Sequence, residues 1–100
     1  MNSIHVENMR SPQSDRPVAN QYIITDDEQG KIFQSYQSTI AVCTDDGQID
    51  LDETYWDYSR TTLKYLKEFL GQTTSKRITS KKEIQAKIDS GEYKLADLNK

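Results

Sequence analysis

The chain has 100 residues, of which 34% are hydrophobic and 29% charged, and its formal net charge is −3. A chain of this length forms one domain with a single small core, and no run in it is long and apolar enough to cross a bilayer. Cys43 is the single cysteine, and the first residues lack the basic start and apolar stretch of a secretion signal. These features argue against a membrane protein and favour a cytoplasmic one.

Residues 1–19 contain Pro12 and Pro17, with several serines and asparagines and no sustained hydrophobic periodicity. This composition is typical of a flexible segment. We therefore expect an N-terminal arm at residues 1–19, either disordered, packed on the domain or held by a partner. The remaining residues, 20–100, are expected to form a single α+β domain.

Short apolar runs separated by turn signals follow the arm, and Asp46-Gly47 is a strong signal for a tight hairpin. This pattern predicts three to four antiparallel strands. Because Ile32, Tyr36 and Ile40 share one parity, the second and third runs can also be read as one bent strand. The runs are residues 22–25, 31–36, 39–44 and 48–51.

A helix is predicted at residues 59–70, because Ser59 can cap its first turn and Leu63 and Leu66 recur at helical spacing. Gly71 can end this helix in the left-handed conformation.

A second, short helix is predicted at residues 80–90, where Ser80 and Glu83 form a capping-box pattern and Gly91 follows the last turn. Residues 93–98 are then expected to form a closing strand or an apolar strap. The fold class is therefore α+β, with a small antiparallel sheet packed against one main helix and the second short helix.

The sequence contains no arrangement typical of an active site. The only histidine, His5, lies in the predicted arm, and Cys43 has neither a histidine nor a base near it in the sequence. The carboxylates of residues 50–57 lack the alternation and central glycine of a calcium loop, so we interpret them as a solvated turn. We therefore expect no enzymatic activity, no cofactor and no metal.

Charge is divided unevenly along the chain, since residues 1–58 hold eleven acidic and three basic side chains and residues 59–100 hold five and ten. Two acidic turns in the first half can present carboxylates to a basic groove on a partner, including a groove that normally holds nucleic acid. The alternative is that these turns only keep the protein soluble. Their residues are Asp26, Asp27, Glu28, Asp45 and Asp46.

A basic segment at residues 76–82 holds four cations and no acid. Two of its lysines fall at a predicted helix N-terminus, where the macrodipole disfavours positive charge. A phosphate bound there would meet both the lysines and the free amides of the first turn. The alternative is a solvated loop. The candidate nucleic-acid-binding residues are Lys76, Arg77, Lys81 and Lys82.

Three aromatic residues, Tyr55, Trp56 and Tyr58, lie just before the first predicted helix. They can serve as interface anchors or base-stacking platforms, or they can pack under the helix. Tyr55 and Trp56 point in different directions in an extended segment, so both cannot easily be buried. We therefore treat these two residues as candidates for partner binding.

Several motifs carry a family resemblance: Arg16-Pro17-Val18-Ala19-Asn20, Phe33-Gln34-Ser35-Tyr36, Thr39-Ile40-Ala41, Trp56-Asp57-Tyr58-Ser59, Thr61-Thr62, Lys64-Tyr65, Phe69-Leu70-Gly71 and Lys87-Ile88-Asp89-Ser90-Gly91-Glu92-Tyr93. The chain resembles a family of small uncharacterised proteins from phages and mobile elements of Gram-positive bacteria. The resemblance covers most of residues 13–98 and leaves the first dozen residues outside. It implies an accessory protein of a mobile element in the bacterial cytoplasm, and it assigns no catalytic residue.

Together these features lead us to expect a protein that binds and inhibits a host protein, with a nucleic-acid-guided defence nuclease of the CRISPR type as the favoured target. The step from a mobile-element setting to inhibition is an analogy. The alternative is an accessory protein that binds nucleic acid through the basic segment at residues 76–82. The sequence sets neither the identity of the partner nor the oligomeric state.

Overall fold

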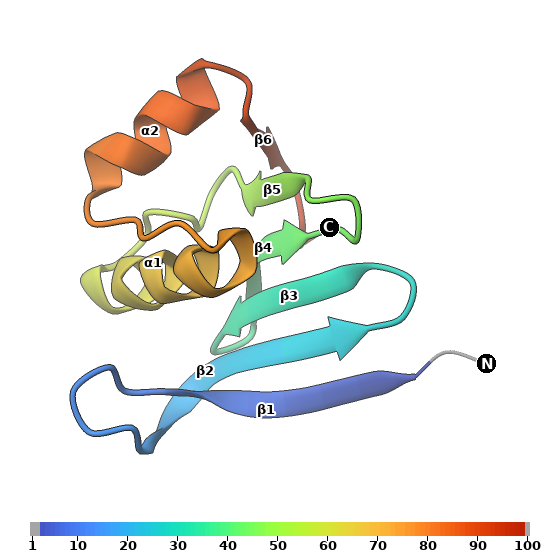
Figure 1. Cartoon of the computed structure of the whole chain (residues 1–100), viewed down its shortest axis with the longest axis vertical. Helices are drawn as coiled ribbons and strands as arrows, with labels where there is room; N and C mark the ends of the chain where they lie inside the picture. The colour runs from blue at the N-terminus through green and yellow to red at the C-terminus, as the bar shows by residue number, and fades with distance from the viewer. Residues whose placement is uncertain (1–2, 100) are drawn as a thin grey trace.

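The computed structural model describes residues 3–99, which form a six-stranded mixed sheet with two helices on one of its faces (Figure 1). The strands lie in the sheet in chain order, and every neighbouring pair is antiparallel except β5 and β6, which are parallel. The elements are β1 (Ile4–Arg10), β2 (Pro17–Asp26), β3 (Gly30–Ser35), β4 (Ser38–Cys43), β5 (Ile49–Asp52), α1 (Arg60–Thr74), α2 (Lys81–Asp89) and β6 (Tyr93–Ala96).

The α+β class agrees with the sequence prediction, but the predicted three to four antiparallel strands are wrong in number and in direction. The sheet has six strands, because β1 and β6 extend it at its two edges. A parallel pair needs a crossover connection, and α1 and α2 supply it between β5 and β6. The bent-strand reading is also wrong, because β3 and β4 are separate strands joined by a turn at Tyr36 and Gln37.

Residues 4–10, which the sequence analysis placed in an N-terminal arm, form the edge strand β1 and pair with β2 from Ile4 opposite Asp26 to Arg10 opposite Pro17. The loop between these strands is closed by a backbone hydrogen bond of 2.9 Å from the Ser11 N–H to the Arg16 carbonyl oxygen. Hydrogen bonds to β2 therefore hold most of this polar segment on the sheet.

α1 begins as predicted, with the Ser59 side chain accepting a hydrogen bond from the Thr62 N–H. The helix does not end at Gly71 but continues to Thr74, and Ser75 after it has a left-handed φ of 60°. The last turn is held in part by side chains, since the Thr74 hydroxyl donates to the Leu70 carbonyl oxygen at 2.6 Å. α2 confirms the second short helix at its predicted place.

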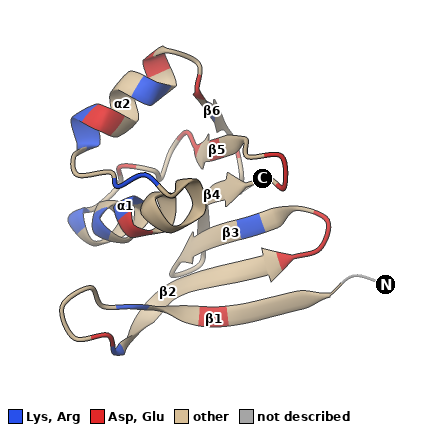
Figure 2. Ribbon diagram, viewed as in Figure 1, with Lys and Arg blue, Asp and Glu red and all other residues tan. Residues whose placement is uncertain are grey.

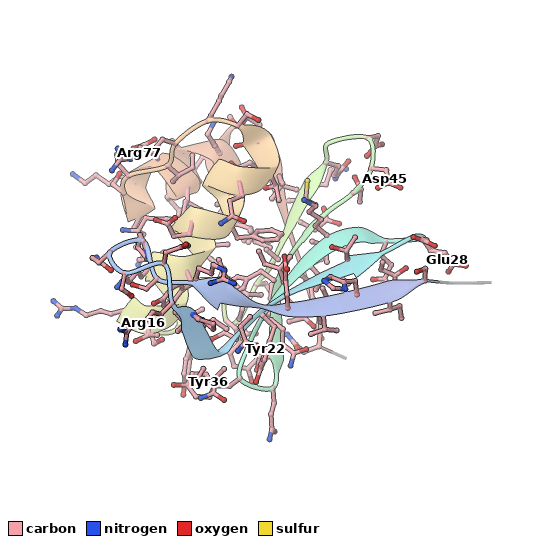
Figure 3. The ribbon with its side chains drawn as sticks, turned by 60° about the horizontal axis from the view of Figure 1, so that its bottom comes forward. Arg16, Tyr22, Glu28, Tyr36, Asp45 and Arg77 are labelled. Carbon is pink, nitrogen blue, oxygen red and sulfur yellow. The ribbon has the colours of Figure 1, made fainter. Side chains whose placement is uncertain are left out.

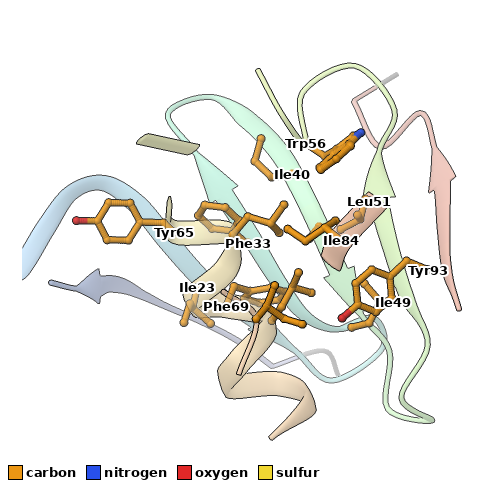
Figure 4. Close-up of a cluster of buried hydrophobic side chains, with 14 of the residues drawn as sticks. Ile23, Phe33, Ile40, Ile49, Leu51, Trp56, Tyr65, Phe69, Ile84 and Tyr93 are labelled. Carbon is orange, nitrogen blue, oxygen red and sulfur yellow. The ribbon is translucent and has the colours of Figure 1, made fainter. Parts of the chain in front are cut away.

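One hydrophobic core fills the space between the helices and the sheet (Figure 4). Its sheet side is a row of residues paired across four neighbouring strands: Ile23, Phe33, Ala41 and Leu51. From α1, Leu66 and Phe69 are fully buried, and the Phe69 ring stacks on Phe33 with 5.8 Å between the ring centroids. Ile84 joins this cluster from α2, so both helices pack on the same face.

Leu66→Ala should lower the free energy of unfolding by about 2–5 kcal/mol, because it opens a cavity at a fully buried position between α1 and the sheet. Urea denaturation measures this loss. Leu95→Ala serves as the control, since Leu95 is 43% exposed and should cost less than about 1 kcal/mol. Equal losses for the two variants would show that α1 is not packed as described.

Candidate functional site

The face of the sheet opposite the helices carries an apolar row. Successive residues of a strand point to opposite faces of the sheet. In each strand, the residue next to the core-row residue therefore points to this open face. Here Val6 pairs with Ile24, Ile24 with Ile32 and Ile32 with Val42, and the same row continues to Asp50 and Lys94. The row is accessible at its β1 end, where Val6 is 55% exposed, whereas Ile24 and Val42 are half-buried and Ile32 is buried. We call Val6, Ile24, Ile32 and Val42 the open-face row.

A hollow beside this row is lined by aromatic and amide side chains, including Tyr22, Gln34 and Tyr36. Tyr36 is 58% exposed and has a left-handed φ of 56°. Its backbone N–H donates a 2.7 Å hydrogen bond to the carbonyl oxygen of Asn20, which is itself left-handed with a φ of 67°. A large side chain pays an energetic penalty in this region of backbone space, and such conformations cluster at binding and catalytic sites.

The two acidic turns lie at the same end of the sheet, because the β2–β3 and β4–β5 connections of an antiparallel meander fall on the same side (Figure 2). Asp26 is buried and accepts a 2.8 Å hydrogen bond from the Glu28 N–H, so it shapes its own turn. In contrast, Asp27, Glu28 and Asp45 are exposed. We call these three residues the acidic end.

Asp46 is the last of the five candidate residues in the acidic turns, and its side chain points back toward its own loop. Its Oδ1 accepts hydrogen bonds from the Thr44 hydroxyl and, at 3.4 Å, from the Gln48 N–H. The bond from Thr44 is the main reason that the pKa of Asp46 lies below its usual value, with the Gln48 N–H adding to the effect. These hydrogen bonds therefore favour the charged form of the Asp46 carboxylate.

Most of the basic residues lie in α1, the loop that follows it and α2, away from the two acidic turns (Figure 2). Figure 3 shows Arg16 and Arg77 projecting on the side opposite Glu28 and Asp45. Arg16 and Arg77 therefore lie on the opposite side of the molecule from the two acidic turns.

The four predicted nucleic-acid-binding residues are in different environments. Lys76 and Arg77 are exposed in the α1–α2 loop, and Lys82 is exposed in the first turn of α2. Lys81 is already engaged, since its Nζ lies 3.1 Å from Asp57 Oδ2 and 5.8 Å from the centroid of the Trp56 ring. The structure therefore does not gather these four cations into one free cluster.

The aromatic residues before α1 separate into buried and exposed members. Trp56 is only 5% exposed and belongs to the core, whereas Tyr58 is 72% exposed. Tyr55 is half-buried, and its ring lies edge to face with Tyr58 at 5.6 Å between centroids. Trp56 is thus placed as a core residue, and Tyr55 and Tyr58 are the accessible aromatic side chains here.

The buried carboxylate of Asp52 shapes this aromatic segment. It accepts hydrogen bonds from the backbone N–H groups of Thr54 at 3.1 Å, Tyr55 at 2.9 Å and Leu98 at 2.9 Å. These bonds fold the segment into a turn and tie the C-terminal stretch to β5. Among the acidic residues at positions 50–57, Asp52 therefore has a structural role.

Within residues 3–99, no three His, Cys, Asp or Glu side chains are placed to hold a metal ion. His5 is exposed on β1, with its Nε2 3.7 Å from Glu7 Oε2, and Cys43 is half-buried beside the core. In this described part of the chain, neither helix has both the length and the apolar character needed to span a bilayer.

A family model described as a family of unknown function (DUF8033) matches residues 4–86. The chain belongs to this family. The match begins at the first residue of β1 and ends within α2, so it includes most of the first dozen residues, which the resemblance had left outside. No curated protein and no solved structure matches the chain.

Sequence reasoning missed the open-face row, although a signal for it exists. Ile23-Ile24 and Ile32-Phe33 are adjacent apolar pairs within strands. Since neighbouring residues point to opposite faces, such a pair places an apolar side chain on both faces of the sheet. A search for doublets rather than alternation would have indicated a sheet that is apolar on both sides.

Replacing Tyr36 tests whether its backbone is strained. Tyr36→Gly should give a protein about 1 kcal/mol more stable than Tyr36→Ala, because both remove the ring but only glycine adopts the left-handed region without a steric penalty. Thermal denaturation of the two variants measures the difference. An alanine variant as stable as the glycine variant would show that Tyr36 is not strained.

Proposed function

We propose that this protein binds a partner protein through the open-face row and the acidic end, and that the binding inhibits a partner whose basic surface normally holds nucleic acid. The observation that carries the proposal is the adjacency of the two features. Ile24 in the row and Asp26 at the start of the acidic turn are two residues apart on β2, and the exposed carboxylates follow directly.

This arrangement matches the general anatomy of a protein interface. Interfaces combine an apolar centre with a polar rim, and an accessible apolar patch on a small protein often marks a binding site. Charge at the rim steers the encounter and selects partners of opposite sign. The acidic end therefore favours a partner with a basic surface, and the row supplies the apolar contact area.

Inhibition follows from competition for the same surface. A groove that binds the phosphate backbone presents lysine and arginine side chains, which the exposed carboxylates of the acidic end can engage in place of phosphates. Nucleic-acid-guided nucleases hold their heteroduplex in a positively charged channel. Such a nuclease is the target that the resemblance to mobile-element proteins favours, in the cytoplasm of a bacterial host.

The acidic end can be tested by affinity capture from a bacterial host lysate treated with nuclease, followed by association-rate measurements on the purified pair. The triple variant Asp27→Ser, Glu28→Ser, Asp45→Ser should slow association about tenfold at low salt and much less at high salt, because it removes the steering charge. The matched control is Glu53→Ser, Asp89→Ser, Asp97→Ser, which removes three exposed carboxylates elsewhere.

Val6→Ser tests the apolar part of the same interface at an exposed position of the edge strand. This variant should speed dissociation while leaving the association rate nearly unchanged. Equal slowing by the two triple variants would contradict the role of the acidic end. A partner that is captured only when nucleic acid is intact would contradict direct protein binding.

A further inference from the structure

A groove on the basic side of the molecule runs between the β1–β2 loop and α1, and the α1–α2 loop forms its end. Pro12 and Gln13 line it on one side, and Lys64, Lys67 and Arg77 contribute its positive charge. We propose that this groove binds the phosphodiester backbone of a nucleic acid. The site is distinct from the open-face row and the acidic end, and it does not depend on the function proposed for them.

The cations of the groove have no carboxylate partner. Ion pairs within residues 3–99 involve Lys81, Lys87 and His5, and none of them includes Lys64, Lys67 or Arg77. Glu68 is the one acid in the lining and is half-buried, as Lys67 is, so three cations stand against one carboxylate. The groove therefore keeps a net positive charge that a bound anion can neutralise.

α1 begins with basic rather than acidic residues. The first turn of α1 contains no acid, and Arg60 and Lys64 lie in its N-terminal half, where acidic residues would be the stabilising choice. α2 differs, because its first turn contains Glu83 and its Lys87 is paired with Glu92 at 2.7 Å.

The spacing of the cations suits an extended anion. Residues three apart lie on the same face of a helix, so Lys64 and Lys67 follow one another along the groove. Arg77 approaches the groove from the loop after α1, and Gln72 and Ser75 supply neutral donors in the lining. Arg16 projects on the same side of the molecule as Arg77 (Figure 3). This is a track of separated positive charges, which matches successive phosphates of one strand.

The location differs from that predicted by the sequence. The sequence makes the basic segment at residues 76–82 a candidate for binding phosphates at the N-terminus of α2, with a solvated loop as the alternative, but Lys81 is paired with Asp57. Of the four cations of that segment, Arg77 lines the groove, whose other two cations come from α1. The fold thus brings together charges that lie apart in the sequence.

Fluorescence anisotropy with a labelled 20-nucleotide single strand, its duplex and poly-L-glutamate as competitor tests the proposal. The variant Lys64→Gln, Lys67→Gln, Arg77→Gln should weaken binding at least tenfold for single strand and duplex alike. The matched control is Lys31→Gln, Lys82→Gln, Lys94→Gln, which makes the same charge change at exposed positions outside the groove and should weaken binding less than about threefold. For the single strand, the groove variant should also reduce the salt-dependence slope by about 2, the value for three phosphate contacts.

A second measurement uses the unaltered protein and so does not depend on the folding of a variant. Bound oligonucleotide should protect Lys64 and Lys67 from acetylation and leave Lys82 and Lys94 reactive. Equal weakening by both triple variants would show that binding depends only on the net charge of the protein, and it would overturn the proposal. Displacement of the oligonucleotide by poly-L-glutamate of the same charge at equal concentration would assign the groove to acidic proteins instead, and the absence of binding to either oligonucleotide would also refute it.

Discussion

The structure depends on the fact that two helices can cover only one face of this sheet. Six strands spaced by about 4.8 Å span roughly 24 Å, and two packed helices of about 10 Å diameter cover roughly 20 Å of one face. The crossover from β5 to β6 places both helices on the same face, where they bury a single core. The opposite face is left without a covering layer, although four of its strands place aliphatic residues on it.

The same topology separates the charges. Five of the sixteen acidic residues fall at the β2–β3 and β4–β5 turns, and the antiparallel meander brings these two turns to one end. Eight of the thirteen basic residues fall in α1, the loop after it and α2, which also carry three acidic residues (Figure 2). A chain with a net charge of only −3 thus has its two acidic turns and most of its basic residues on different elements.

Capping and turn residues in the sequence were sufficient to predict the helices and the hairpin, because these elements begin and end through contacts between neighbouring residues. The caps at Ser59 and Ser80 and the turn at Gly47 predicted both helices and a hairpin where the structure has them. Gly71 was misread as a helix end, because threonine side chains and a left-handed Ser75 close α1 one turn later. β1 was missed because its stability comes from pairing with β2 rather than from its own polar sequence.

Candidate sites were less predictable than the fold, since they depend on distant residues. The acidic turns could be read as local clusters, but their common location at one end follows from strand order. Trp56 was expected to be a possible anchor and lies in the core, because Asp52 folds the segment before α1 into a turn. The basic groove joins residues more than fifty positions apart, from Gln13 to Lys67, so no local pattern indicates it.

The most direct test of the partner-binding surface is an amide chemical-shift map of the isotopically labelled protein, recorded free and bound to the partner captured from the nuclease-treated lysate. The account predicts that the largest changes fall on β1 to β4 and in the two acidic turns, at residues such as Val6, Ile24, Glu28 and Asp45. Changes concentrated instead on α1, α2 and the loop between them, with an unchanged open-face row, would contradict it.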